Sequence, residues 1–150
     1  MKMIMTNDVR RAYFHAKARR TVFVQLPPED AHEGMCGELQ KSMYGTRDAA
    51  QNWAQEYTRT LVAAGFRVGR ASPCNFYCER TEVGGTVHGD DFSASGPEAG
   101  LRELEATLGA KYEIKTEILG PGPGHKQEIR ILNRVLRWTA EGIAYEPDQR

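Results

Sequence analysis

The sequence predicts an α+β fold, an antiparallel sheet with two helices packed on one face in the split β-α-β arrangement. Strand-like runs and two amphipathic helical segments alternate in the order strand, helix, strands, helix, strand. A pair of adjacent acids stands between two short strand-like runs, which is typical of a hairpin tip and favours antiparallel pairing. With a length of 150 residues, the chain suits a single domain, residues 1–150, around one core.

The two helices are predicted from their caps and their apolar periodicity. Asp48 can cap the first helix, with Gln51 three residues on as in a capping box, and Gly65 stands where a C-terminal cap belongs. Pro97 is expected at the first position of the second helix, and Gly109 at its end. The apolar stripes are Trp53, Tyr57, Leu61 and Ala64 in the first helix and Leu101, Leu104 and Leu108 in the second.

Strand composition accounts for most of the remaining chain. Turns are expected at Val83-Gly84-Gly85 and near Glu141-Gly142. The expected strands are residues 1–8, 21–26, 35–39, 66–68, 75–80, 86–87, 92–94, 112–115, 128–138 and 143–145.

Composition narrows the functional classes only slightly. Twenty basic residues balance twenty acidic ones, so the overall charge gives no indication of nucleic-acid binding. Cys36, Cys74 and Cys78 have neither a disulfide framework nor a zinc-site spacing, so we expect buried structural cysteines in an intracellular protein. We find no signal peptide and no apolar run long enough for a membrane span, and we expect no membrane association.

Gly89-Asp90-Asp91 is the main candidate site. Aspartate is a common turn residue, so one interpretation is a solvated turn. The other is a cation site, because two carboxylates at one exposed edge repel each other unless a cation neutralises them, and Mg²⁺ prefers hard oxygen ligands. Asp8, an isolated acid at the end of the first strand, supplies a third carboxylate and favours the cation site.

A basic run follows Asp8, with no acid before Glu29. Such a run is either a solvated face or, beside a carboxylate site, a surface that holds a phosphate backbone. Its members are Arg10, Arg11, Lys17, Arg19 and Arg20.

Three motifs together resemble the palm of a reverse transcriptase. They are Asp-Val-x-x-Ala-Tyr-Phe from Asp8, Lys-Ser-Met-Tyr-Gly from Lys41, and His-Gly-Asp-Asp-Phe from His88, in this order and spacing. Residues 22–29, 63–66 and 72–74 are similar to segments of the Ty1/copia class of retrotransposons. The likeness runs from about Asp8 to the C-terminus.

The resemblance implies an RNA-directed DNA polymerase that uses a primed RNA or DNA template, deoxynucleoside triphosphates and Mg²⁺ or Mn²⁺. It implies that Asp8, Asp90 and Asp91 are catalytic metal ligands. Tyr13, Tyr44 and Gly45 are then nucleotide-binding residues, Tyr13 lying under the incoming sugar. Arg10, Arg11, Arg137 and Trp138 are the expected nucleic-acid contacts, and residues 128–145 are expected to begin the primer-grip hairpin.

The sequence also departs from the family pattern. His88 and Gly89 stand where Tyr and an apolar residue are usual, and Asp48 and Ala50 replace Gln and Pro. We expect the fingers, thumb and RNase H portions of a polyprotein to be missing, and the isolated fragment to be inactive. The alternative is a transposon relic or a domesticated palm that binds RNA or protein without polymerising.

Overall fold

The computed structural model describes residues 1–147, in two compact units. The larger unit combines Met1–Arg10 with the chain from Thr60 onward, and the smaller one is Arg11–Arg59. The α+β prediction is confirmed, because the described residues form two α-helices and sheets in which every strand pairing is antiparallel.

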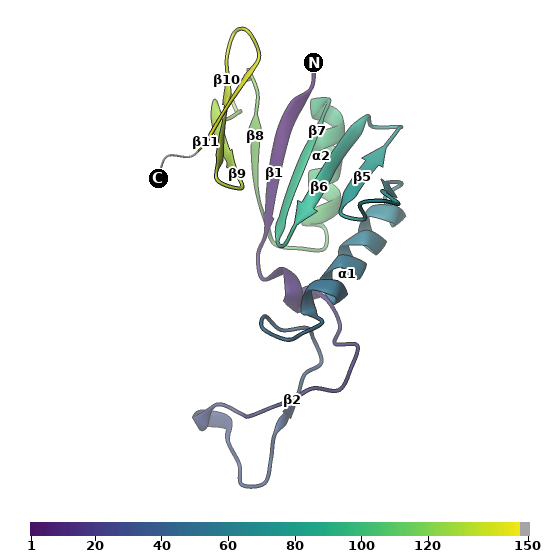
Figure 1. The fold of residues 1–150 in the computed structure, drawn as a ribbon, viewed down its shortest axis with the longest axis vertical. Coiled ribbons are helices and arrows are strands. Elements are labelled where there is room, and N and C mark those ends of the chain that lie inside the picture. Colours follow the sequence, from purple (N-terminus) through teal and green to yellow (C-terminus); the bar gives the residue numbers. More distant parts are fainter. Residues whose placement is uncertain (148–150) are drawn as a thin grey trace. The chain divides into compact units, whose positions relative to one another are not determined.

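A six-stranded sheet, in the order β4-β5-β6-β7-β1-β8, forms the larger unit (Figure 1). The first strand of the chain therefore lies between β7 and β8. The strands are β1 (Met3–Val9), β4 (Arg67–Val68), β5 (Asn75–Cys78), β6 (Val83–His88), β7 (Asp91–Gly96) and β8 (Ile114–Leu119).

One face of this sheet is apolar and packs against α2 (Glu98–Gly109), which contacts β7, β1 and β8. Alternate residues of β1 point into this core, as the two-residue period of a strand requires. The predicted stripe of α2 is confirmed, since all three of its leucines are fully buried. The helix begins one residue later than predicted, because Pro97 keeps an extended ψ of 146° directly after β7.

The opposite face of the sheet is partly covered by a three-stranded sheet in the order β11-β10-β9. Its strands are β9 (Glu128–Ile131), β10 (Arg134–Trp138) and β11 (Ile143–Pro147). Ile129 and Leu136 pack on Leu119 of β8, with Ile4 of β1 against the same cluster. This small core covers one end of the face and leaves the end that carries Asp8 open.

The prediction of one strand over residues 128–138 is wrong. Leu132 and Asn133 have φ values of 46° and 60° and form a two-residue turn that joins β9 to β10. Positive φ at both positions is the pattern of a type I′ hairpin turn, which asparagine tolerates well. The predicted turn near Glu141-Gly142 is confirmed, since Thr139 N–H donates to Gly142 O across it (2.8 Å).

The prediction of a turn at Val83-Gly84-Gly85 is also wrong, because all three residues belong to β6. The chain turns instead just before β6, where Glu82 has a φ of 53°. A Cβ at Gly85 would lie 2.3 Å from Ser93 O and 2.6 Å from Phe76 Cζ. Glycine is therefore needed at position 85 for close packing inside the sheet.

The strand predicted at residues 112–115 begins at Ile114 and continues to Leu119. Tyr112 precedes it as a buried side chain whose hydroxyl lies 2.8 Å from Thr60 Oγ1. The expectation that the cysteines are buried holds for Cys78 alone, because Cys36 is exposed and Cys74 is half-buried.

The smaller unit holds little regular structure. Its predicted strand pair forms, but it is reduced to two residues on each side. The elements are η1 (Ala12–His15), β2 (Phe23–Val24), η2 (Pro28–Asp30), β3 (Gly37–Glu38) and most of α1 (Ala49–Ala63), whose last turn belongs to the larger unit.

Both ends of α1 lie where the sequence predicts them, while the capping-box contact between Asp48 and Gln51 stays a prediction. Asp48 directly precedes the helix, and its carboxylate accepts hydrogen bonds from Arg20 Nε (3.0 Å) and Asn52 Nδ2 (3.1 Å). Desolvation opposes these hydrogen bonds, yet together with the charge of Arg20 they lower the pKa of Asp48. Gly65 has a φ of 89° just after the helix, as a C-terminal glycine cap requires.

Neither α-helix of residues 1–147 combines the length and apolar character that crossing a membrane requires.

Candidate active site on the polar face of the sheet

The adjacent acids lie at a tight hairpin between β6 and β7. His88 pairs with Asp91 across the sheet, so Gly89 and Asp90 alone form the turn. Gly89 has a φ of 59°, and Asp90 has a negative φ, which is the pattern of a type II′ turn with glycine at its first central position. The turn fixes which face of the sheet each flanking side chain occupies.

Asp8 lies directly opposite Asp91 on the neighbouring strand β1. The main-chain N–H of Val9 donates to Asp90 O (3.0 Å), so the next pair, Asp8 with Asp91, is a non-hydrogen-bonded one. Side chains approach most closely across such pairs. The predicted convergence of Asp8 with the hairpin is therefore confirmed, although a role in metal binding stays a prediction.

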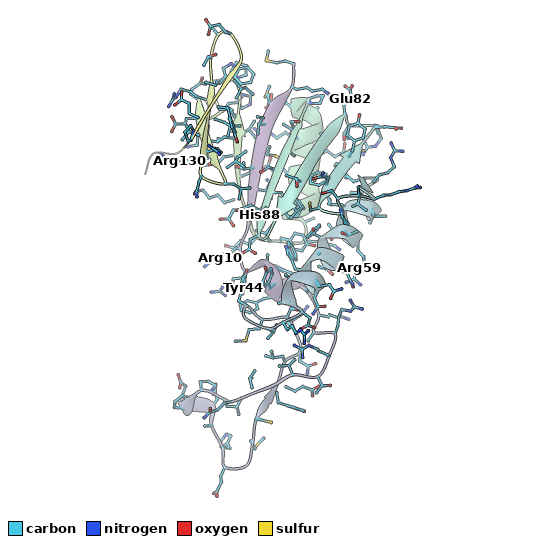
Figure 2. The ribbon with its side chains drawn as sticks, in the orientation of Figure 1. Arg10, Tyr44, Arg59, Glu82, His88 and Arg130 are labelled. Atoms are coloured by element: carbon cyan, nitrogen blue, oxygen red, sulfur yellow. The ribbon has the colours of Figure 1, made fainter. Side chains whose placement is uncertain are left out.

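Four side chains form one row across the polar face of the sheet. The register places them in the order His88, Asp91, Asp8 and Lys115, on β6, β7, β1 and β8. All four residues are exposed, and Figure 2 shows His88 at the end of β6. The two acids thus lie between an imidazole and an ammonium group.

The charges of this row are only partly balanced. Asp91 is exposed as a residue, but partial desolvation of its carboxyl raises its pKa, and the like charges of Asp8 and Asp90 raise it further. His88 acts in the opposite direction. A cation bound between the two acids would relieve this repulsion.

A cleft of about 180 Å³ opens beside the acid pair, between the polar face of the sheet and the β9–β10 turn. Lys115 and Arg130 bring basic groups to it, and Figure 2 marks Arg130 on β9. The volume is below the ~300–1,000 Å³ of pockets that enclose small molecules, so the cleft suits ions and a phosphate group better than a whole nucleotide. It is lined by Thr6, Asp8, Asp91, Ser93, Lys115, Glu117, Arg130, Ile131 and Leu132.

The donor set fits a metal ion that shares its ligands with a substrate. Within residues 1–147, no three histidine, cysteine or acidic side chains are grouped so that they could hold an ion by themselves. Magnesium is commonly held by one or two carboxylates, with water and substrate phosphates completing its shell. Asp8 and Asp91 meet that requirement, and Asp90 is in the adjoining turn.

The predicted nucleotide-binding residues lie in the smaller unit. The rings of Tyr13 and Tyr44 stack with centroids 4.3 Å apart and planes 17° from parallel. Phe14 meets Tyr44 edge-on at 5.5 Å, and Gly45 follows with a φ of 88°. This aromatic contact joins two sequence motifs, but their contact with a nucleotide stays a prediction.

Two of the predicted nucleic-acid contacts, Arg137 and Trp138, lie at the end of β10, and their contact with nucleic acid stays a prediction. Arg137 pairs with Glu128 (2.9 Å) and Glu146 (3.3 Å), and the hydrogen bond that Arg137 donates to Glu128, followed by the charge of Glu146, raises the pKa of Arg137. Trp138, the next residue in the strand, points to the other face and packs against the small apolar core.

The basic run after Asp8 also has acidic partners. Arg10 Nη1 lies 2.6 Å from Glu113 Oε1, and Arg20 pairs with Asp48. Arg11 has a left-handed φ of 53° just before η1. These ion pairs favour the solvated-face interpretation for Arg10 and Arg20.

Sequence reasoning missed Lys115 and Arg130 as residues of the cleft. Lys115 is placed by the register of β1 with β8, whose paired positions are distant in the chain. Arg130 is placed by the turn at Leu132–Asn133, which the sequence does not mark with glycine. Pairing β1 with β8, the edge strand of the six-stranded sheet, would have placed Lys115 beside Asp8.

Comparison with known proteins gives one family. A family profile described as reverse transcriptase (RNA-dependent DNA polymerase) matches residues 1–118. No curated protein matches the chain.

Proposed function

Because the chain belongs to the reverse transcriptase family of the Ty1/copia type, we propose that its acid row is the polymerase centre of an RNA-directed DNA polymerase. The substrates are a primed RNA or DNA template and deoxynucleoside triphosphates. The reaction joins the primer 3′-hydroxyl oxygen to the α-phosphorus and breaks the bond to the leaving pyrophosphate.

The observation that carries the proposal is the closest-approach pairing of Asp8 with Asp91 beside a cleft with basic groups. Asp8 and Asp91 would hold Mg²⁺ or Mn²⁺ with Asp90 in support. When bound, these ions supply Lewis acidity that activates the attacking hydroxyl and neutralises charge on the phosphates. The residues themselves act by positioning and charge, without a side-chain nucleophile.

Basic side chains at the cleft complement the acids. A triphosphate approaching Asp8 and Asp91 is repelled unless cations hold it. Lys115 and Arg130 line the same cleft and are suited to contact phosphate oxygens, Arg130 by its planar fork. Tyr13, stacked on Tyr44 in the smaller unit, is proposed to exclude a 2′-hydroxyl from the incoming sugar.

The test is metal-dependent primer extension. Residues 1–150 are joined to the fingers and thumb of an active Ty1/copia-type polymerase, and incorporation of deoxynucleotides is measured with Mg²⁺. We expect Asp8→Asn and Asp91→Asn each to lower incorporation by at least about 100-fold. Removing one group that stabilises charge in the transition state has an effect of about this size. Asp30→Asn, in the exposed turn η2 of the smaller unit, serves as the control and should keep full activity.

Two results separate a polymerase centre from a palm that binds nucleic acid without catalysis. Incorporation that survives Asp8→Asn and Asp91→Asn unchanged would overturn the assignment of the centre. A folded hybrid that binds primer–template but incorporates nothing would favour the other class of function, a domesticated palm that binds nucleic acid without catalysis.

A further inference from the structure

We propose that Tyr44 is a positioning residue for Tyr13, and that the stack between their rings sets how strictly the site rejects a ribonucleotide. This inference rests on the proposed function, because it concerns the same exclusion of a 2′-hydroxyl. It gives Tyr44 a role that acts through Tyr13 and needs no contact of Tyr44 with the sugar.

Tyr13 lies in a segment that does little by itself to orient a ring. Its element, η1, is only four residues long, and the side chain of Tyr13 is half-buried. A side chain in such a place has more than one staggered rotamer open to it, whereas a steric block has to stand in one position. The ring of Tyr44, stacked with centroids 4.3 Å apart and planes 17° from parallel, favours a single rotamer of Tyr13.

The backbone holds Tyr44 in a tight turn. Thr46 N–H donates to Met43 O (3.1 Å), and the Thr46 hydroxyl donates to the same oxygen (2.7 Å). Tyr44 and Gly45 are therefore the two central residues of the turn, and Gly45 has a φ of 88°. Positive φ at the second central position is the pattern of a type II turn, which favours glycine. The turn thus fixes where the side chain of Tyr44 leaves the backbone.

Hydrogen bonds fasten this turn to the end of η1. Ser42 N–H donates to Ala16 O (2.8 Å), directly after η1. The Ser42 hydroxyl donates to Lys17 O (3.3 Å) and accepts from Asn52 Nδ2 of α1 (3.0 Å). Ser42 and Asn52 are both buried, so water competes little for these bonds. The two segments that carry the stacked rings are therefore held to each other on both sides of the stack.

Phe14 supports Tyr44 from a second direction, with ring centroids 5.5 Å apart and planes at 90°. Edge-on contacts of this kind are among the favoured geometries of aromatic pairs. Tyr44 nevertheless stays 40% exposed, on the segment just before α1 (Figure 2). Replacing Tyr44 should therefore release the ring of Tyr13 without opening a buried core.

The size of the effect follows from the population of the blocking rotamer. Without the stack, Tyr13 spends more time in rotamers that leave room for a 2′-hydroxyl, and ribonucleotides enter during that time. The energy of one aromatic pair corresponds to a change in population of about 2–10-fold. We expect Tyr44→Leu to raise ribonucleotide incorporation by this factor and to leave deoxynucleotide incorporation almost unchanged. Tyr44→Phe keeps the ring and should match the native protein.

The experiment compares kcat/KM for ribonucleotides and deoxynucleotides in the hybrid polymerase that carries residues 1–150. Tyr44→Leu is measured alone and together with Tyr13→Ala. If Tyr44 acts through Tyr13, adding Tyr44→Leu to Tyr13→Ala does not change the ratio further, as expected for two residues of one unit. Tyr77→Leu is the matched control, because Tyr77 is 42% exposed in β5 of the larger unit, and it should keep the native ratio.

A second measurement needs no polymerase activity. In the 150-residue chain with ring-labelled tyrosine, the ring protons of Tyr13 should show an upfield NMR shift caused by the neighbouring ring. Tyr44→Leu should abolish this shift, and Tyr44→Phe should keep it. A native chain in which Tyr13 shows no such shift would overturn the inference.

The outcomes distinguish this inference from the proposed function. A folded hybrid that incorporates no deoxynucleotide overturns the proposed function and this inference with it. An active hybrid in which Tyr44→Leu lowers both rates alike, or leaves the ratio unchanged, overturns the positioning role alone. That role is also overturned if Tyr44→Leu changes the ratio as much beside Tyr13→Ala as it does alone, because Tyr44 would then meet the sugar directly.

Discussion

At the scale of single residues, the arrangement that would let Asp8 and Asp91 bind a cation also lowers the stability of the fold. Asp8 and Asp91 are held at the closest approach that an antiparallel sheet allows, and the pKa of Asp91 is raised by desolvation and by its acidic neighbours. Ionising Asp91 at neutral pH therefore costs folding free energy. The sequence could predict that these acids meet, since one ends a strand and the other lies at a hairpin, but it could not show how closely.

We therefore expect Asp91→Asn to stabilise the metal-free protein by roughly 0.2–1 kcal/mol, the range of exposed charge pairs. The amide is nearly the same shape as the carboxylate and removes the repulsion from Asp8. Urea unfolding at pH 7 without divalent ions measures the effect, with Asp30→Asn as the control for loss of one exposed negative charge. If Asp91→Asn unfolds at a lower urea concentration than the native protein, other groups in the fold already offset the repulsion between Asp8 and Asp91.

At the scale of elements, the strands follow their apolar pattern, while the turns depend on contacts that no local pattern contains. Gly84 and Gly85 were expected to turn the chain, yet they lie inside β6, where Gly85 lets the backbone approach Ser93. The turn at Leu132–Asn133 has no glycine, and it was missed. In both places tertiary packing, which involves residues distant in the chain, decides the role of the local residue.

Gly85→Ala tests this interpretation of β6. The added methyl group meets the main-chain oxygen of Ser93, which cannot move without disturbing the β6–β7 ladder. We expect a loss of about 1–3 kcal/mol in the free energy of unfolding, the usual cost of overpacking. Gly124→Ala is the matched control, because nothing lies within 4 Å of its added Cβ, and its unfolding midpoint should stay close to that of the native protein.

At the scale of the whole molecule, a hydrogen-bonded histidine in the larger unit joins the loop between β8 and β9 to the start of α2. His125, in the loop between β8 and β9, accepts a hydrogen bond from Gly122 N–H at Nδ1 (2.9 Å). Its Nε2 therefore carries the proton and donates to Glu98 Oε1 at the start of α2 (3.0 Å). This hydrogen bond lowers the pKa of Glu98 below its ordinary value, against a smaller opposing effect of burial.

A lowered pKa in the folded state fixes the sign of the pH dependence. The contribution of Glu98 to stability is present above its ordinary pKa of 4.5 and is lost as the pH falls below that value. We expect the native protein to lose stability between pH 5 and 3 more steeply than Glu98→Gln, so the two unfolding midpoints converge in acid. Urea titrations across this range measure the difference, and Glu141→Gln, in an exposed turn, should follow the native curve.

The position of β1 has a consequence for how the protein is made. Asn7 Nδ2 donates to Thr116 Oγ1 (2.8 Å), and the two residues are 109 positions apart. At the ~5–20 residues per second of synthesis, β1 leaves the ribosome roughly 5–20 s before β8 exists to pair with it. Until β7, α2 and β8 have been made, the side chains of Met3, Met5 and Val9, which are buried in the finished fold, lack part of the structure that covers them. Early β1 is therefore a natural substrate for chaperones, and the register that sets Asp8 opposite both Asp91 and Lys115 is complete only after β8 has been made.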